Sequence, residues 1–233
     1  MPSVKIEKYI LRSPLSISQV AQNSTHLKMP LPEEPFTLKG GCNCGAIRYK
    51  MNVPKFDDRP LSVYCDEHAI SEEARFPQVL IDHCNDCRRA TGCMTPVWIA
   101  TVVSYTEFSI QGNEEKSSIK GEEIFKIENL GTKQYAPLKW FKSSDTKFRG
   151  FCDNCGTSLC YRSTNLMPGW PDMVDILLGT VDREDLEKDW LKPERELWWE
   201  MGIPWVRDLT WDGTLKEVLP RHPLWKMNHH VSS

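Results

Sequence analysis

Three groups of cysteine and acidic residues in the sequence have spacings that suit metal binding. Two of the groups are cysteine pairs, Cys42 with Cys44 and Cys152 with Cys155, and each pair is followed directly by glycine. A tight turn aims two sulfurs at one ion, and glycine allows the positive φ that such a turn needs. Together the pairs make the four-thiolate set of a structural zinc site. The alternative interpretation is that these are buried, reduced thiols without metal.

The third group is Asp82, Cys84 and Cys87, which supplies three ligands rather than four. Asp82 and Cys84 repeat the one-residue spacing of the first cysteine pair. Three protein ligands leave a fourth position for water or substrate, which is the arrangement of catalytic zinc. Two other interpretations stay open. In one, the two cysteines bind no metal, and in the other, the Asp82 carboxylate only pairs with Arg88 or Arg89.

Residues beside the third group are candidates for catalysis and substrate binding. His83 competes as a ligand or acts as a proton shuttle, although adjacent residues of an extended segment point to opposite sides. Arg88 is a candidate to hold an anionic group of the substrate, with pairing to a neighbouring aspartate as the alternative. Cys65 and His68 have a ligand-like spacing, but the two carboxylates between them make a surface loop the competing interpretation.

The composition is that of an ordinary globular protein. Its 233 residues are 40% hydrophobic and 26% charged, with a net charge of -3 and no basic stripe, so nucleic acid is excluded as the main partner. No apolar run approaches the roughly 18 residues of a membrane span. The first residues lack the apolar centre of a signal peptide, which predicts a cytoplasmic protein whose cysteines bind metal rather than form disulfides.

The elements expected to position these residues are mainly strands. Residues 47–53 alternate between apolar and polar side chains, the period of a half-buried strand. Further strands are expected at 79–82, 97–103, 122–128, 156–162 and 174–180, with turn residues between them. Helix signals are confined to 182–187 and 71–75. The pattern therefore predicts a mainly β domain.

Two segments outside the expected strands differ in composition. Residues 1–36 are rich in Ser and Pro and predict an extended N-terminal arm, while 37–233 contain no linker and form one domain.

Cys93 and Cys160 have apolar surroundings, which predicts buried packing thiols. The last third of the chain holds seven of the nine tryptophans, for which core packing is expected and a ligand pocket or a dimer contact is the alternative: Trp170, Trp190, Trp198, Trp199, Trp205, Trp211 and Trp225.

Three ordered motifs resemble the glutathione-dependent formaldehyde-activating enzyme family, whose domain also occurs in centromere protein V. They are GCNCGAIRY at 41–49, HCNDCRRATG at 83–92 and RGFCDNCGT at 149–157. The resemblance implies a Mss4-like, twisted β-sheet fold with zinc knuckles. It also implies a structural zinc on the two cysteine pairs, a second zinc on the middle motif, and the activity of a carbon-sulfur lyase that joins formaldehyde to glutathione.

One departure from the family pattern lies in the middle motif, where Asp82 stands in place of a cysteine. A carboxylate donates less electron density than a thiolate, which leaves a harder, stronger Lewis acid. We therefore expect a zinc-dependent enzyme of the carbon-sulfur lyase type that acts on a small molecule, at a carbon-sulfur bond or a thiol-carbonyl adduct. The alternatives are a non-enzymatic zinc scaffold that binds a protein partner, and a family member repurposed for another carbonyl substrate.

Overall fold

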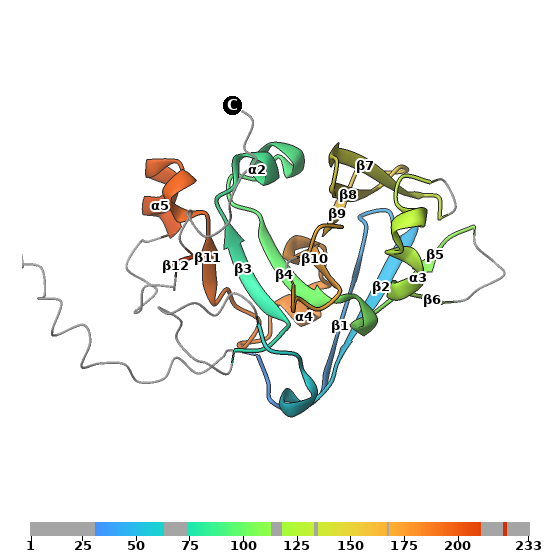
Figure 1. Ribbon diagram of the computed structural model, residues 1–233, viewed down its shortest axis with the longest axis horizontal. Helices are drawn as coiled ribbons and strands as arrows, with labels where there is room; N and C mark the ends of the chain where they lie inside the picture. The colour runs from blue at the N-terminus through green and yellow to red at the C-terminus, as the bar shows by residue number, and fades with distance from the viewer. Residues whose placement is uncertain are drawn as a thin grey trace, which may run out of the picture.

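The computed structural model describes residues 31–62, 74–112, 118–132, 135–166, 168–210 and 221–222. Cys65, His68 and most of the helix expected at 71–75 lie outside these residues. Within the described part, strands form two sheets, one of four strands and one of eight (Figure 1). The prediction of a mainly β fold is confirmed.

The smaller sheet carries the first cysteine pair. It has the order β1 (Phe36–Gly41), β2 (Ile47–Val53), β5 (Thr106–Ile110) and β6 (Ile119–Lys120), with each neighbouring pair antiparallel. Every second side chain of β2 is buried, as its alternating sequence predicts. The turn between β1 and β2 holds Cys42 and Cys44.

The larger sheet carries the other candidate ligands. Its strand order is β12 (Arg221–His222), β11 (Arg195–Leu197), β3 (Gln78–Asp82), β4 (Val97–Val102), β10 (Met173–Leu177), β9 (Ser158–Ser163), β8 (Lys147–Cys152) and β7 (Leu138–Ser144). β11 runs parallel to β3 and β12, and the remaining pairs are antiparallel. Because β11 and β4 pair with the two edges of β3 and hydrophobic clusters cover both of its faces, all of its residues are buried.

Two hydrophobic clusters lie on opposite faces of the larger sheet. The main core joins both sheets and includes Tyr49 and Phe108 from the smaller sheet and Val79 from β3. The next residue, Leu80, belongs to a second cluster with Phe76 and residues of β4, β10 and β11. Since successive side chains of a strand point to opposite faces, this second cluster lies on the face turned away from the smaller sheet.

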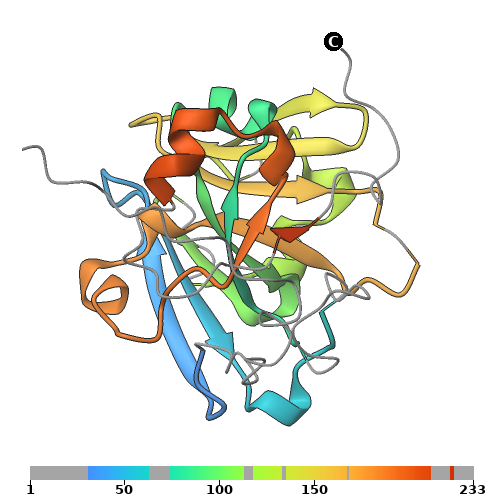
Figure 2. The ribbon, with the colours of Figure 1, turned by 90° about the vertical axis from the view of Figure 1, so that its left-hand side faces the viewer.

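Short helices connect the strands. Among the described residues, the α-helices are α2 (Asn85–Thr91), α3 (Gly121–Ile124), α4 (Arg183–Leu186) and α5 (Pro204–Thr210), and 3-10 turns occupy Phe56–Asp58, Val103–Tyr105, Ile127–Asn129, Leu178–Thr180 and Trp199–Met201. α4 confirms the helix expected at 182–187. α5 and β11 lie at one end of the molecule, on the left in Figure 1 and toward the viewer in Figure 2. No helix among the described residues is long and apolar enough to span a membrane.

The strand expected at 122–128 is wrong, because this segment forms α3 and a 3-10 turn. Gly121 packs so closely against Thr106 that an added Cβ would lie 2.0 Å from the threonine Oγ1. The adjacent residues Ile124 and Phe125 are both buried, which a single helical turn permits and an exposed edge strand does not. A short apolar run does not distinguish these two structures by its period.

Two predictions about cysteine and tryptophan burial need correction. Cys160 is buried as expected, but Cys93 is exposed because it follows the left-handed Gly92 that ends α2. Trp190 and Trp198 pack against the hydrophobic clusters, whereas Trp205 on α5 is 56% exposed. Trp211 and Trp225 lie outside the described residues.

The last residues of the expected arm are attached to the domain. Leu31 is 3% exposed and belongs to the main core. The buried guanidinium of Arg59 donates hydrogen bonds to the backbone carbonyls of Pro32, Glu33 and Glu34. The chain is therefore tied to the sheets from residue 31 onward, although the sequence places residues 31–36 in the arm.

Candidate metal sites

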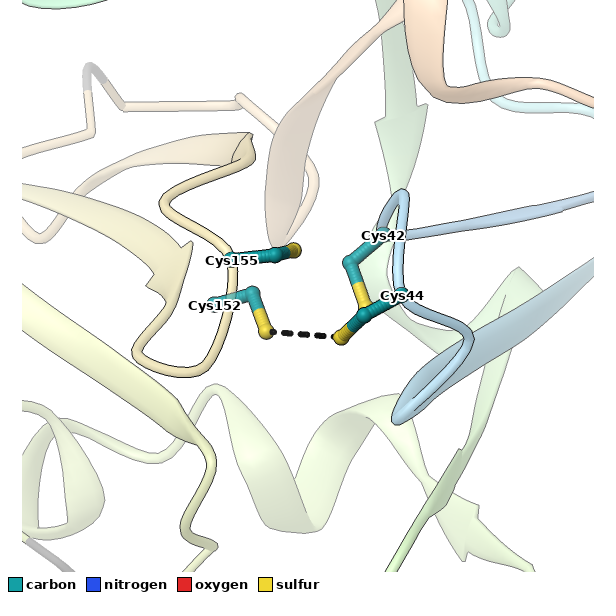
Figure 3. Close-up of side chains that lie close together, drawn as sticks. All are labelled: Cys42, Cys44, Cys152 and Cys155. Atoms are coloured by element: carbon teal, nitrogen blue, oxygen red, sulfur yellow. Dashed lines mark hydrogen bonds between the residues drawn. The ribbon is translucent and has the colours of Figure 1, made fainter.

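The two cysteine pairs meet in space. Cys42 and Cys44 lie in the turn after β1, whereas Cys152 ends β8 and Cys155 lies in the turn before β9. Figure 3 shows the four side chains pointing toward one another from these two turns. Their sulfur atoms all lie within 4.8 Å of one another. The structure brings the two pairs together, and their predicted role as zinc ligands stays a prediction.

The spacing of these sulfurs fits a tetrahedral zinc ion. The Sγ atom of Cys44 lies 3.5 Å from that of Cys42 and 3.8 Å from that of Cys152. Zinc–sulfur bonds of about 2.3 Å give a tetrahedron whose edges are about 3.8 Å. The backbone N–H of Asn43 donates to the hydroxyl of Thr157 at 3.1 Å and so links the two turns. The cluster could therefore hold zinc without rearrangement of the backbone.

Hydrogen bonding and burial act in opposite directions on the thiols of the second pair. The Thr157 hydroxyl lies 3.2 Å from the Cys155 sulfur and lowers the pKa of that thiol to about 6. Burial raises the pKa of Cys152 to about 12. Because zinc binds thiolates, metal binding at this cluster at neutral pH displaces protons from its thiols, and the Cys152 proton is among them.

The three residues of the middle motif also come together, and we call them the triad. Asp82 is the last residue of β3, Cys84 is the N-cap of α2, and Cys87 lies in the first turn of that helix. Their ligand atoms lie within 4.8 Å of one another. The sequence did not predict α2, although Gly92 at its C-terminus is a typical signal, with a φ of 71°.

The Asp82 carboxylate is buried and held by two hydrogen bonds. The backbone N–H of Cys84 donates to Oδ1 at 2.8 Å, and the indole N–H of Trp98 donates to Oδ2 at 3.0 Å. Within the described residues Asp82 forms no ion pair with an arginine, so the alternative of pairing with Arg88 or Arg89 is not observed. Burial raises the pKa of Asp82. A bound dication would supply the positive charge that this buried carboxylate lacks.

Arg149 lies against the triad, and the sequence did not single it out. It belongs to β8, and its Nη1 and Nη2 atoms donate to Cys87 Sγ over 3.7 and 3.6 Å. Contact between Cys84 and Cys87 lowers the pKa of Cys84 and raises that of Cys87. Trp98 and Arg149 both lie far from the triad in sequence. The sequence signal that could have drawn attention to Arg149 is its place in the third family motif, residues 149–157, and Trp98 belongs to none of the three motifs.

His83 and Arg88 lie beside the triad in sequence, but His83 faces elsewhere. The His83 ring is buried, with Nε2 3.3 Å from Glu196 Oε1 and its centroid 5.3 Å from the Trp199 ring. It does not belong to the triad, in agreement with the alternation of an extended segment. The Nε atom of Arg88 is buried and has no hydrogen-bond partner in the described part of the chain. The predicted roles of both residues stay predictions.

Asp175 is a further buried carboxyl on this sheet. It pairs across strands with Ala100 of β4 and Tyr161 of β9, and its Oδ1 has no hydrogen-bond partner among the described residues. Burial raises its pKa to about 7, and the negative charge of Asp82 adds to the increase. Ionising Asp175 in the folded protein therefore costs free energy.

We expect the substitution Asp175→Asn to stabilise the protein above neutral pH. The folded-state pKa of about 7 exceeds the unfolded value of about 3.8, so stability is lost as pH rises through this interval. An amide stays neutral and avoids this loss. The advantage in unfolding free energy should widen between pH 5 and 7, level off above 7, and reach on the order of 2 to 4 kcal/mol. Thermal melts across this range would check it. Asp189→Asn, at an exposed site, should follow the parent, and equal pH profiles for Asp175→Asn and the parent would contradict the expectation.

Comparisons with known proteins agree with the motifs. A family model of the glutathione-dependent formaldehyde-activating enzyme matches residues 61–201, more than half of the chain. This range contains the triad and the second cysteine pair, whereas Cys42 and Cys44 precede it. The predicted resemblance is confirmed, and with it the Mss4-like class of the fold.

Matches among individual proteins are sparser. No curated protein matches the chain. A crystal structure of a Rhodobacter sphaeroides protein, a Northeast Structural Genomics target, is similar with 17% sequence identity and a TM-score of 0.32. The match covers 64% of this chain and 95% of that one.

Proposed function

Because the chain belongs to the glutathione-dependent formaldehyde-activating enzyme family, we propose that it is a zinc-dependent enzyme of the carbon-sulfur lyase type. The observation that carries this proposal is the presence of two donor sets, one of four cysteines and one of three ligands. A closed four-sulfur set suits a structural zinc, and a three-ligand set leaves a position for substrate. The substrate class is a small thiol with an aldehyde, or the adduct of the two.

The chain itself prepares the triad for this chemistry. Asp82, Cys84 and Cys87 would hold the zinc ion, which would supply Lewis acidity for polarising a carbonyl group or stabilising a thiolate. The N–H groups of Cys84 and Trp98 each hold one oxygen of the Asp82 carboxylate, so that the orientation of this ligand is set by its surroundings. Asp82 and Cys87 are 4% and 8% exposed, whereas Cys84 is half-buried and is the most solvent-accessible residue of the triad.

The proposed reaction joins a thiol to an aldehyde without redox change. The thiol sulfur forms a bond to the carbonyl carbon while the carbon–oxygen π bond breaks. The thiol proton leaves sulfur, the former carbonyl oxygen gains a proton, and the product is a hemithioacetal, which for formaldehyde is an S-hydroxymethyl adduct. The reverse reaction cleaves the carbon–sulfur bond. Because Asp82 makes the site harder than three thiolates would, a carbonyl compound other than formaldehyde fits the same proposal.

The flanking residues enter the proposal with different roles. Arg88 is the proposed anchor for an anionic group of the substrate, since its buried Nε lacks a partner among the described residues. His83 contacts Glu196 of β11, and its backbone N–H donates to the carbonyl of Leu197 at 3.0 Å. This favours a positioning role, in which His83 holds the end of β3 against β11, over direct proton transfer.

The proposal is tested by adduct formation from formaldehyde and glutathione, with other small thiols and aldehydes in parallel. The purified chain is assayed as isolated, after treatment with a chelator, and after reloading with zinc. Catalysis should disappear on metal removal and return when two zinc ions per chain are restored. The exposed Cys93→Ser variant is the matched control and should behave as the parent. Full zinc loading without catalysis of any thiol–carbonyl pair would favour the alternative, a scaffold that binds a protein partner.

A further inference from the structure

Arg149 connects the triad to the strand that carries the four-cysteine cluster. It lies in β8, the strand that ends at Cys152, and its guanidinium reaches Cys87 on α2 with two N–H groups. The side chain is 8% exposed. A buried arginine needs compensation for its charge. In the described part of the chain, no carboxylate lies within ion-pair distance of this guanidinium.

The aromatic contact of Arg149 does not neutralise its charge. The guanidinium carbon lies 5.1 Å from the centroid of the Tyr161 ring, which is the cross-strand neighbour of Arg149 on β9. A ring face attracts a cation, but it does not neutralise one. The two N–H groups donate instead to the Cys87 sulfur.

The charges of the triad explain why a cation belongs at this place. With a divalent ion, one carboxylate and two thiolates sum to a single net negative charge in a buried site. That charge would oppose the entry of an anion such as a thiolate. The Arg149 guanidinium stays protonated in proteins and brings the sum to zero. Two N–H donors on the Cys87 sulfur also fix the position of this ligand, and outer contacts of this kind strengthen metal binding.

We propose that Arg149 is a positioning residue that holds the Cys87 sulfur and neutralises the triad, so that the loaded site accepts an anionic ligand. This inference rests on the proposed function, because it assigns a metal to Asp82, Cys84 and Cys87. It also gives the substrate a chemical class: a thiol that enters as its anion. The same strand, β8, then contributes a ligand to one site and the counter-charge to the other.

The test uses cobalt(II) as the probe, because its thiolate charge-transfer bands report the sulfur ligands of each site. We expect Arg149→Gln to keep the first cobalt ion and to lose about 10- to 100-fold in affinity for the second. Azide, an anion, and imidazole, a neutral ligand, are then titrated into the cobalt-loaded protein. In Arg149→Gln the ratio of azide affinity to imidazole affinity should be at least about tenfold lower than in the parent. Arg149→Lys keeps the positive charge and should restore part of this azide-to-imidazole ratio.

The control is Arg162, a buried arginine of the neighbouring strand that pairs with Asp172 and donates to the Met173 carbonyl. Arg162→Gln should leave the second cobalt affinity and the azide-to-imidazole ratio unchanged even where it lowers the melting temperature. The inference is overturned if Arg149→Gln folds, binds the first ion, and matches the parent in both quantities. If that variant does not fold, the Arg149→Lys variant decides, and parental cobalt affinity in it overturns the inference. A parent chain that binds only one cobalt ion overturns the proposed function as well.

Discussion

The substitution Cys155→Ser should remove the zinc of the four-cysteine cluster and lower the free energy of unfolding by at least about 4 kcal/mol. Cys42 and Cys44 come from the smaller sheet, and Cys152 and Cys155 come from the larger one. A bound ion therefore joins two elements that are distant in sequence, and its binding free energy becomes folding free energy. For a chain of this size the melting temperature should fall by roughly 10 °C.

Elemental analysis and thermal melts of the variant check this expectation. Cys93→Ser is the matched control, because this cysteine is exposed and belongs to neither donor set. It should keep the zinc content and the melting temperature of the parent. A Cys155→Ser protein that melts with the parent, or a parent without zinc after preparation free of chelators, would show that the cluster does not stabilise the fold through a metal.

The second large effect is expected from Asp82→Ala, which should abolish the second metal ion and spare the first. The two donor sets share no residue, so loss of one ligand of the triad leaves the four cysteines complete. Affinity for the second ion should fall more than about 100-fold. Loss of a residue that only hydrogen-bonds to a metal ligand already lowers metal affinity by about 10- to 100-fold, and Asp82 is itself a proposed ligand. The catalysed reaction of thiol and aldehyde should fall with it. Zinc stoichiometry and activity, measured on the same preparations, are the readouts.

Two companion variants separate the ligand role of Asp82 from its structural role. Asp82→Cys places a thiolate at this position, as in the family pattern, and should keep two zinc ions while favouring thiol ligands over water. Asp86→Ala changes an exposed aspartate in the same segment and should match the parent. Parent and Asp82→Ala with the same zinc count and the same activity would contradict the catalytic assignment, and a shared count of one zinc ion would indicate a protein with a single zinc site.

The sequence alone predicts the features of this protein that depend on the spacing of neighbouring residues. Two sulfurs separated by one or two residues and followed by glycine share a turn, whatever lies around them. This is why both cysteine pairs were predictable as local pairs of sulfurs, whereas Asp82, Cys84 and Cys87 could be grouped because they lie so close together in the sequence. The alternation from Ile47 to Val53 determined which face of β2 is buried, because side chains of a strand alternate between its faces. The presence of an aspartate at position 82, where the family has cysteine, is likewise a fact of the sequence alone.

Only the tertiary structure decided how these local units meet. Cys44 and Cys152 are 108 positions apart, and sheet packing brings their sulfurs to 3.8 Å. The contact of Arg149 with Cys87 depends on where α2 lies over β8, and no local pattern encodes this. The segment 122–128 became a helical turn because close packing of Gly121 against Thr106 overrides a weak strand preference. Spacing within a turn is set by covalent geometry, whereas contacts between strands depend on the burial of the whole chain.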